Sequence, residues 1–215
     1  MLDPADRNRW TDPEHARAYL ERAARIPRRA DGERALLECL PRDVERVLDL
    51  GSGDGRLLDL VLRASPGASG VALEFSPAML GRLRARWSGA GPVTIVEHDL
   101  DARLPALGPF DAVVSSFAIH HVDDDRKRTL YEEVFGLLRP GGVFCNLEHV
   151  ASPTPGLHAW FLTALDVPPG GEDPSNRLLD VETQLGWLRA LRFEDVDCHW
   201  KWRELALLAG VRPHG

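Results

Sequence analysis

A glycine-rich turn directly after a short apolar segment constrains the fold of this chain more than any other feature. Residues 46–50 read Arg-Val-Leu-Asp-Leu, the pattern of a buried strand, and Gly51, Gly53 and Gly55 follow at alternate positions. Such glycines let the backbone turn tightly and approach a ligand, and a helix after the turn offers free N–H groups at its start. We therefore expect a strand, a ligand-binding turn and a helix over residues 55–64.

The succession of apolar segment, polar turn and helical pattern recurs along the chain. It predicts four more strands, at residues 70–74, 93–96, 111–116 and 143–147. This alternation is typical of a doubly wound α/β fold, a mostly parallel sheet with helices on both faces. Residues 196–202 and 205–211 lie too close together for a helical crossover, so we expect an antiparallel C-terminal hairpin.

Two stretches lie outside the alternation. Residues 1–40 look helical, with Thr11 and Glu14 at capping-box spacing, and residues 151–180 are rich in Pro and Gly around Trp160. Both are expected to cover the carboxyl edge of the sheet, with simple packing as the alternative. The chain is thus read as one domain, residues 1–215, divided into a helical lid (1–40), a core (41–150), a covering insertion (151–180) and a C-terminal helix with a strand pair (181–215).

Charge and composition narrow the class of protein. The chain has 215 residues, which suits one domain with a sizeable core, and a net charge of −7. Its basic residues are interleaved with acids, and even Arg82, Arg84 and Arg86 are expected on the solvated face of a helix. A broad nucleic-acid-binding surface is therefore not expected.

The cysteines and the N-terminal residues indicate the cellular compartment. Residues 1–7 carry acids where a signal peptide needs a basic and then an apolar stretch, and no segment approaches membrane-spanning length. The odd number of cysteines, without metal-ligand spacing, suits a reducing compartment, and we expect Cys39, Cys145 and Cys198 to be small buried side chains. We expect a cytoplasmic protein without a membrane partner, as a monomer or homodimer.

Polar residues and glycine recur where the predicted strands end. They are Asp49, Gly51, Glu74, Asp99, Ser116 and Glu148. In an open α/β sheet ligands bind outside the carboxyl ends of the strands, and an acid at the end of the second strand can accept hydrogen bonds from ribose hydroxyls. Arg56 stands where a dinucleotide fingerprint needs its third glycine, which disfavours a nicotinamide-dependent dehydrogenase.

Residues 47–55, Val-Leu-Asp-Leu-Gly-Ser-Gly-Asp-Gly, resemble the first motif of class I S-adenosylmethionine-dependent methyltransferases. Further segments resemble later motifs of that family: residues 70–80, 97–100, 110–122 and 137–142. The resemblance implies a Rossmann-like, seven-stranded sheet and S-adenosylmethionine as cofactor. Residues 182–210 are more loosely similar to a subgroup that contains tRNA wobble-uridine carboxymethyltransferases.

The resemblance also implies roles for individual residues. Gly51 and Gly53 would face the methionine part of the cofactor, Glu74 the ribose, and Asp99 the adenine amino group. Phe75 and Leu100 would wall the adenine ring, and Tyr19, Arg28 and Arg29 would close over the methionine carboxylate. The remaining predicted cofactor contacts are Asp49, Ser52, Met79 and Ser116.

Candidate catalytic residues follow the fourth and fifth strands. They are His120, Glu148 and His149. Neutral histidine can take a proton from a methyl acceptor. On an extended segment His120 and His121 would point opposite ways, so at most one would face the pocket. The alternative is that His120, His121, Asp123 and Glu148 bind a metal ion. Their spacing does not resemble that of the metal ligands in magnesium-dependent catechol-type enzymes, and no metal is expected.

The sequence thus predicts S-adenosylmethionine-dependent methyl transfer to a small-molecule acceptor. Two alternatives remain: an RNA-modifying enzyme of the carboxymethyltransferase type, and a non-catalytic S-adenosylmethionine-binding module. Ser115, Ser116 and Phe117 stand where amine methyltransferases of DNA carry Asn/Asp-Pro-Pro-aromatic, which excludes that chemistry. Residues 1–40 and 151–180 are expected to form together an enclosed chamber for a small, largely apolar acceptor, with aromatic side chains from both segments: Trp10, Tyr19, Trp160 and Phe161. The identity of the acceptor, and the choice among O-, N- and C-methylation, stay open.

Overall fold

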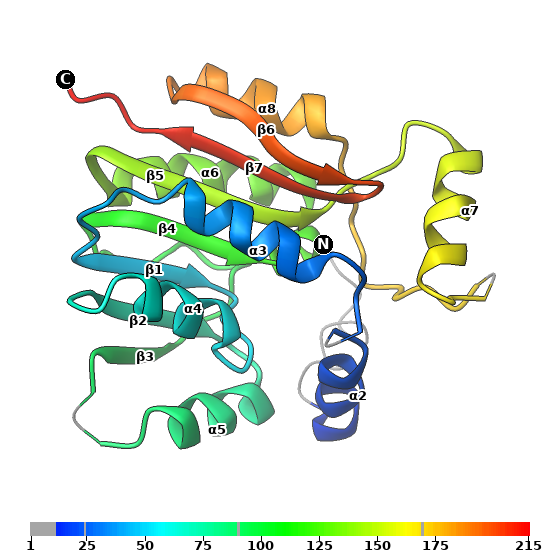
Figure 1. Cartoon of the computed structure of the whole chain (residues 1–215), viewed down its shortest axis with the longest axis horizontal. Coiled ribbons are helices and arrows are strands. Elements are labelled where there is room, and N and C mark those ends of the chain that lie inside the picture. The colour runs from blue at the N-terminus through cyan, green and yellow to red at the C-terminus, as the bar shows by residue number, and fades with distance from the viewer. Residues whose placement is uncertain (1–11, 24, 90, 169) are drawn as a thin grey trace.

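The structure is a computed structural model that describes residues 12–23, 25–89, 91–168 and 170–215. In this part of the chain seven strands form one sheet in the order β3-β2-β1-β4-β5-β7-β6 (Figure 1). Their bounds are β1 Arg46–Leu50, β2 Ser69–Glu74, β3 Val93–Glu97, β4 Phe110–Ser116, β5 Leu138–His149, β6 Glu194–Trp202 and β7 Leu205–Val211. The first five are parallel, and β7 is antiparallel to both β5 and β6.

Helices connect the strands and cover both faces of the sheet (Figure 1). They are α2 Pro13–Ala23, α3 Arg29–Glu38, α4 Arg56–Ala64, α5 Pro77–Arg86, η2 Ile119–His121, α6 Asp124–Leu137, α7 Pro155–Ala164 and α8 Val181–Ala190. Neighbouring residues of β1 point to opposite faces of the sheet, each covered by its own hydrophobic core. Val47 packs with side chains of α3, α4 and α5, while Leu48 and Leu50 pack with those of α6 and α8. The doubly wound fold and the antiparallel C-terminal pair are confirmed.

The start of α5 shows how local sequence positions the edge of the sheet. Pro77 begins the helix and Ser76 occupies the N-cap position, as its sequence predicts. The Ser76 hydroxyl makes no capping bond to the helix; instead its backbone N–H donates to Glu74 Oε1 at 2.8 Å. The turn after β2 is thus tied to the carboxylate at the end of that strand.

Two expectations need correction. The fifth strand begins at Leu138 rather than Val143, because the segment that ends α6 goes on to pair with its neighbours: Gly141 N–H donates to Arg212 O at 2.8 Å. Of the three cysteines only Cys145 is buried; Cys39, at the C-cap of α3, and Cys198, on the edge strand β6, are half-exposed.

Of the two segments outside the alternation, α2 and α7 lie toward the carboxyl ends of the parallel strands. Helix α3 of the first segment instead packs on the face of the sheet, where Leu36 is buried and a Cβ at Gly32 would lie 2.7 Å from the Leu147 side chain. Figure 1 shows α2 and α7 beyond the end to which the arrows of β1, β4 and β5 point. Ala16 and Ala23 of α2 are buried, as its amphipathic pattern predicts, whereas Thr11 of the expected capping box falls outside the described residues. Among the helices of the described ranges, none combines the length and apolarity needed to cross a membrane.

Candidate active site

A cavity of about 270 Å³ lies at the carboxyl ends of β1 to β4. Its walls come from the glycine turn after β1, the ends of the neighbouring strands, and α2. The lining includes nearly the whole set of predicted cofactor contacts: Tyr19, Asp49, Gly51, Ser52, Gly53, Glu74, Phe75, Met79, Asp99, Leu100 and Ser116. Residues far apart in the sequence therefore meet in one place, as expected for this edge of the sheet.

The turn after β1 requires glycine at two positions that face this cavity. Gly51 and Gly53 have φ of 66° and 56°, in the left-handed region that side chains rarely adopt. A Cβ at Gly51 would also lie 2.4 Å from Cβ of Ala118, while one at Gly53 would meet nothing within 4 Å. The backbone at Gly53 is thus open to a ligand, which fits the glycine pattern of the sequence.

Glu74 holds this turn in place. Its Oε2 accepts the Gly53 N–H at 2.8 Å, and its Oε1 accepts the N–H groups of Phe75 at 2.9 Å and Ser76 at 2.8 Å. Burial raises the pKa of Glu74, and these hydrogen bonds oppose that effect. One buried carboxylate therefore joins the ends of β1 and β2.

Asp49 is a second buried carboxyl in the cavity, 1% exposed. Burial raises its pKa to about 7, partly opposed by a hydrogen bond with Ser52. Asp49 Oδ2, Ser116 Oγ and His98 Nε2 are buried polar atoms with no hydrogen-bond partner, and all three residues line the cavity. Since buried polar groups are normally paired, these atoms fit a polar ligand such as a nucleoside joined to an amino acid.

His98 was not predicted as a cofactor contact, although it precedes Asp99 in the segment 97–100 that resembles a motif of the family. One predicted residue does not belong to the cavity. Arg28 is exposed: its backbone is left-handed (φ 63°), and its Nη1 pairs with Asp31 Oδ2 at 3.3 Å. The neighbouring Arg29 lines the cavity, and buried Glu33 accepts its Nε at 2.9 Å.

A second, larger cavity of about 880 Å³ adjoins the first. Tyr19, Ala23, Phe117 and His121 line both cavities and so form their common wall. The second cavity lies between α2, the turn around η2, α7 and the segment after α7. Its position places any molecule that it holds beside the first cavity.

The lining of this second cavity differs in part from the expected apolar chamber. Phe161 and Leu165 contribute apolar surface, but His15, Glu172 and Asp173 make the lining mixed. The aromatic residue expected beside Phe161 is absent from it: the Trp160 side chain is 56% exposed, with the Arg203 guanidinium 3.7 Å from its ring centroid. Trp10 falls outside the described residues.

The two adjacent histidines do not lie on an extended segment. They belong to the 3-10 helix η2, which follows a left-handed backbone at Phe117 (φ 54°), so their rings lie near each other, with centroids 4.0 Å apart. His120 lines the second cavity only, whereas His121 lines both. The expectation that at most one histidine faces a pocket is therefore wrong, and His121 is the residue it missed.

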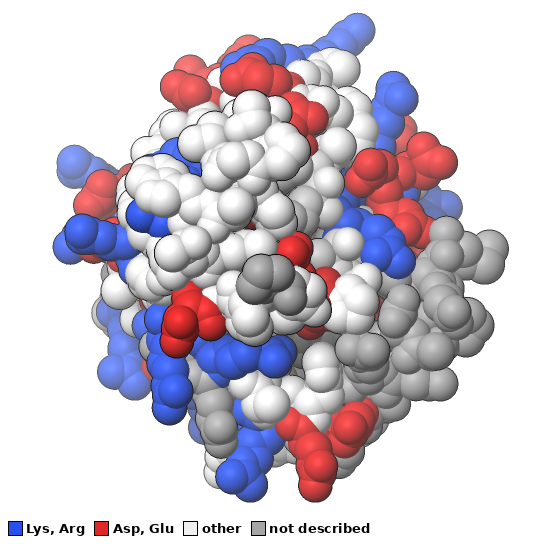
Figure 2. Space-filling model, turned by 90° about the vertical axis from the view of Figure 1, so that its right-hand side faces the viewer, with Lys and Arg blue, Asp and Glu red and all other residues white. Residues whose placement is uncertain are grey.

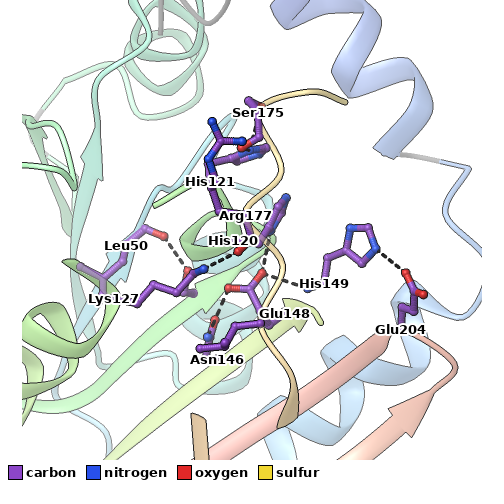
Figure 3. A network of polar contacts seen from close by, with 12 residues as sticks. Leu50, His120, His121, Lys127, Asn146, Glu148, His149, Ser175, Arg177 and Glu204 are labelled. Carbon is purple, nitrogen blue, oxygen red and sulfur yellow. Dashed lines mark hydrogen bonds and ion pairs between the residues drawn. The ribbon is translucent and has the colours of Figure 1, made fainter. Parts of the chain in front are cut away.

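Behind the histidines lies a buried polar network (Figure 3). His120 Nδ1 is 2.6 Å from Glu148 Oε1, which also accepts the His149 N–H at 2.9 Å. Burial raises the pKa of Glu148 to about 7 and lowers that of His120 well below its ordinary value. Glu148 is therefore the member of this pair that changes charge near neutral pH, and His120 connects it to the second cavity.

His149 also lines the second cavity, and its Nε2 is 3.0 Å from Oε2 of buried Glu204. Glu148 itself is buried beneath the cavity wall. Within residues 12–215, apart from positions 24, 90 and 169, no group of three His, Cys, Asp or Glu side chains is arranged to hold a metal ion.

Charged side chains of both signs are spread over this side of the molecule. Figure 2 views the face that is on the right in Figure 1 and shows Lys and Arg interspersed with Asp and Glu around an uncharged area. Arg82, Arg84 and Arg86 of α5 are exposed, as expected, and Arg86 pairs with Asp54. The drawn part of this face is not a uniformly basic surface of the kind that binds nucleic acid.

Comparison with known proteins agrees with this geometry. The family model of the methyltransferase domain matches residues 47–142. A demethylmenaquinone methyltransferase of Clavibacter sepedonicus is 31% identical over 188 residues, covering 80% of this chain and 75% of that protein. An uncharacterised methyltransferase of Mycobacterium tuberculosis is 37% identical over 134 residues, covering 60% of this chain and 64% of that protein.

The fold is shared with solved structures as well. An O-methyltransferase family protein from Burkholderia thailandensis superposes with a TM-score of 0.74 at 22% identity, covering 97% of this chain and 63% of that chain. The chain thus belongs to the class I S-adenosylmethionine-dependent methyltransferases. It spans slightly less than two thirds of the length of the Mycobacterium tuberculosis relative.

The contacts of Glu74 predict its effect on stability. Glu74→Ala removes the acceptor of three backbone N–H groups, and the free energy of unfolding should fall by about 2–4 kcal/mol. Glu74→Gln keeps one acceptor oxygen and should cost less. Urea denaturation measures both, with Glu97→Ala as control, because Glu97 lies opposite Glu74 on β3 and its side chain is 66% exposed. Equal stability of all four proteins would contradict the role of Glu74.

Proposed function

We propose that this protein transfers a methyl group from S-adenosylmethionine to a small-molecule acceptor. The observation that carries the proposal is the pair of adjoining cavities with a common wall at Tyr19, Phe117 and His121. The first has the strand ends and glycine turn of the family, and the second has room for another molecule at its side. Methyl transfer needs this arrangement, because a nucleophile must be aligned behind the methyl group in a site that excludes water.

The residues of the first cavity would hold the cofactor. Gly51 and Gly53 offer backbone without side chains, the Glu74 carboxylate would accept the ribose hydroxyls, and Asp99 would bind the adenine amino group. Asp49 supplies a carboxyl with a buried oxygen that lacks a partner, suited to a cationic group. Bound S-adenosylmethionine supplies an already activated sulfonium methyl group, so the protein's main task is to bind and orient.

The second cavity would hold the acceptor. Helix α2 and residues 151–180 contribute its outer wall, which supports the covering role expected for these segments. Its volume of about 880 Å³ and its place beside the common wall suit a small molecule, and the similarity to a demethylmenaquinone methyltransferase supports this class of acceptor. The mixed charge of the surrounding surface does not favour the RNA-modifying alternative, and the presence of a second chamber favours an enzyme over a binding module.

We further propose that the His120–Glu148 pair receives a proton from the acceptor. His120 lines the second cavity and is hydrogen-bonded to Glu148, so a proton taken at Nε2 can be matched by transfer from Nδ1 to the carboxylate. His149 would contact the acceptor beside it. The free thiols suit a reducing compartment, and we place the enzyme in the cytoplasm, as a monomer or homodimer.

Ligand-induced stabilisation tests the cofactor. S-adenosylmethionine and its demethylated product, S-adenosylhomocysteine, at about 100 times their Kd should each raise Tm by roughly 5–10 °C, because a ligand at that excess adds about 2.7 kcal/mol. NAD at the same concentration should have no effect. Thermal unfolding followed by circular dichroism measures all three, and stabilisation by NAD alone would refute the proposal.

Cofactor affinity should depend on pH through Asp49. Because burial raises the pKa of Asp49 to about 7, the free protein keeps this carboxyl protonated at lower pH, while a bound cation favours the ionised form. Affinity should therefore rise up to about tenfold per pH unit below pH 7 and level off above it. Calorimetry with S-adenosylhomocysteine measures this slope, because this product lacks the sulfonium charge but keeps the cationic amino group of its amino-acid part. Asp49→Asn is the control, and an unchanged slope in that variant would exclude Asp49 as its cause.

Turnover tests the proton acceptor. His120→Ala should lower methyl transfer by about 10²–10⁴-fold, the usual contribution of a general base, with little change in affinity for S-adenosylhomocysteine. Since the pKa of Glu148 is raised to about 7, wild-type turnover should increase as pH rises through that value, and Glu148→Gln should abolish the increase. The assay uses a labelled methyl donor and an acceptor found in a metabolite mixture. Normal turnover by folded His120→Ala would rule out the role.

A further inference from the structure

Residues 173–177 lie across the turn that carries His120 and His121 (Figure 3). The Arg177 N–H donates to His120 O at 2.7 Å, and Lys127 Nζ donates to Arg177 O. These contacts fix the segment against η2 and α6. They also bring Ser175 beside the one histidine that lines both cavities.

Hydrogen-bond directions in this segment can be assigned from its acceptors. Asp173 Oδ1 accepts both the backbone N–H of Ser175 at 3.0 Å and its hydroxyl at 2.7 Å. Burial alone would raise the pKa of Asp173, but these hydrogen bonds hold it below its ordinary value. Asp173 is therefore ionised and can only accept, so the single hydroxyl proton of Ser175 is directed to Asp173.

The tautomer of His121 follows from these directions. Its Nδ1 is 2.9 Å from Ser175 Oγ, and because the hydroxyl proton is already used, Nδ1–H must donate to this oxygen. The same Nδ1 is 3.4 Å from the carbonyl oxygen of Ser175, which also can only accept. Burial, with a further effect of the adjacent His120, lowers the pKa of His121 to about 3, so the ring is neutral and its Nε2 carries a lone pair.

We propose that Asp173 and Ser175 are positioning residues that fix His121 in the Nδ1–H tautomer, so that Nε2 accepts a hydrogen bond from the methyl acceptor at the wall between the two cavities. The class of acceptor follows: it carries an O–H or N–H group in addition to the hydrogen that the His120–Glu148 pair would remove. An acceptor without such a donor cannot make this contact. His121 orients the acceptor and takes no proton, and the acceptor part of this inference rests on the proposed function.

The tautomer can be observed without any methyl acceptor. Two-bond ¹H–¹⁵N spectra of the full chain, saturated with S-adenosylhomocysteine at pH 7, distinguish protonated from unprotonated ring nitrogens. The His121 signals are those missing from His121→Gln. We expect a protonated Nδ1 and an unprotonated Nε2. A His121 ring that is protonated on Nε2, or on both nitrogens, would overturn the proposal.

Asp173→Ala tests the relay itself. Without the Asp173 carboxylate the hydroxyl proton of Ser175 is free to donate to His121 Nδ1, which favours the opposite tautomer. The spectra should show a larger Nε2–H population, and methyl transfer should fall by about 10- to 100-fold, the usual effect of losing a partner that orients a functional histidine. Affinity for S-adenosylhomocysteine should stay within about twofold.

Two further variants complete the test. Asp43→Ala removes a carboxylate at an exposed position before β1 and should alter neither tautomer nor turnover. Ser175→Ala leaves only the carbonyl acceptor and should lower kcat more than it raises KM; it replaces Asp173→Ala if that protein does not fold. A wild-type tautomer in both relay variants would refute the relay. Failure of S-adenosylmethionine to bind would instead refute the proposed function and leave the tautomer result standing.

Discussion

The carboxylate of Glu74 joins the ends of β1 and β2, and the shape of the cavity at the sheet edge depends on this contact. It accepts backbone N–H groups from both sides of the cavity, one from the glycine turn and two from the start of α5. A buried carboxylate is stable only when such donors surround it. The acid that would bind ribose therefore also builds the turn beside which ribose would lie.

Burial has a second consequence at this edge of the sheet. Asp49 and Glu148 lie near the carboxyl ends of β1 and β5, close to the cavities, and burial raises the pKa of each carboxyl to about 7. Burial has the opposite effect on His120 and His121 and lowers their pKa values. Carboxyl groups thus become the groups that change charge near neutral pH, and the histidines stay neutral. In the proposed reaction these groups have different roles. Asp49 would neutralise a positive charge of the cofactor, Glu148 would receive a proton through His120, and His121 would orient the acceptor.

The accuracy of the sequence predictions follows the range of the interactions involved. The strands and the turn at Gly51 were predictable because hydrophobic periodicity and glycine are local signals. The positions of His120 and His121 were not, because a left-handed residue at Phe117 turns the chain into η2 in place of an extended segment. The prediction that Arg28 contacts the cofactor was wrong for a similar reason. The backbone of Arg28 is left-handed and its side chain lies in solvent, whereas Arg29 lines the cavity.

The sequence by itself determined the doubly wound sheet, its antiparallel C-terminal pair and the residues that gather at its carboxyl edge, since parallel strands place their ends together whatever the details of packing. Tertiary structure alone decided the second cavity, the common wall at His121, and the relay from Asp173 through Ser175. These depend on contacts between α2, η2 and the segment after α7, which are separated by up to 160 residues or so in the chain and carry no periodic pattern. Burial, which sets the charge of each group, is likewise a property of the folded chain.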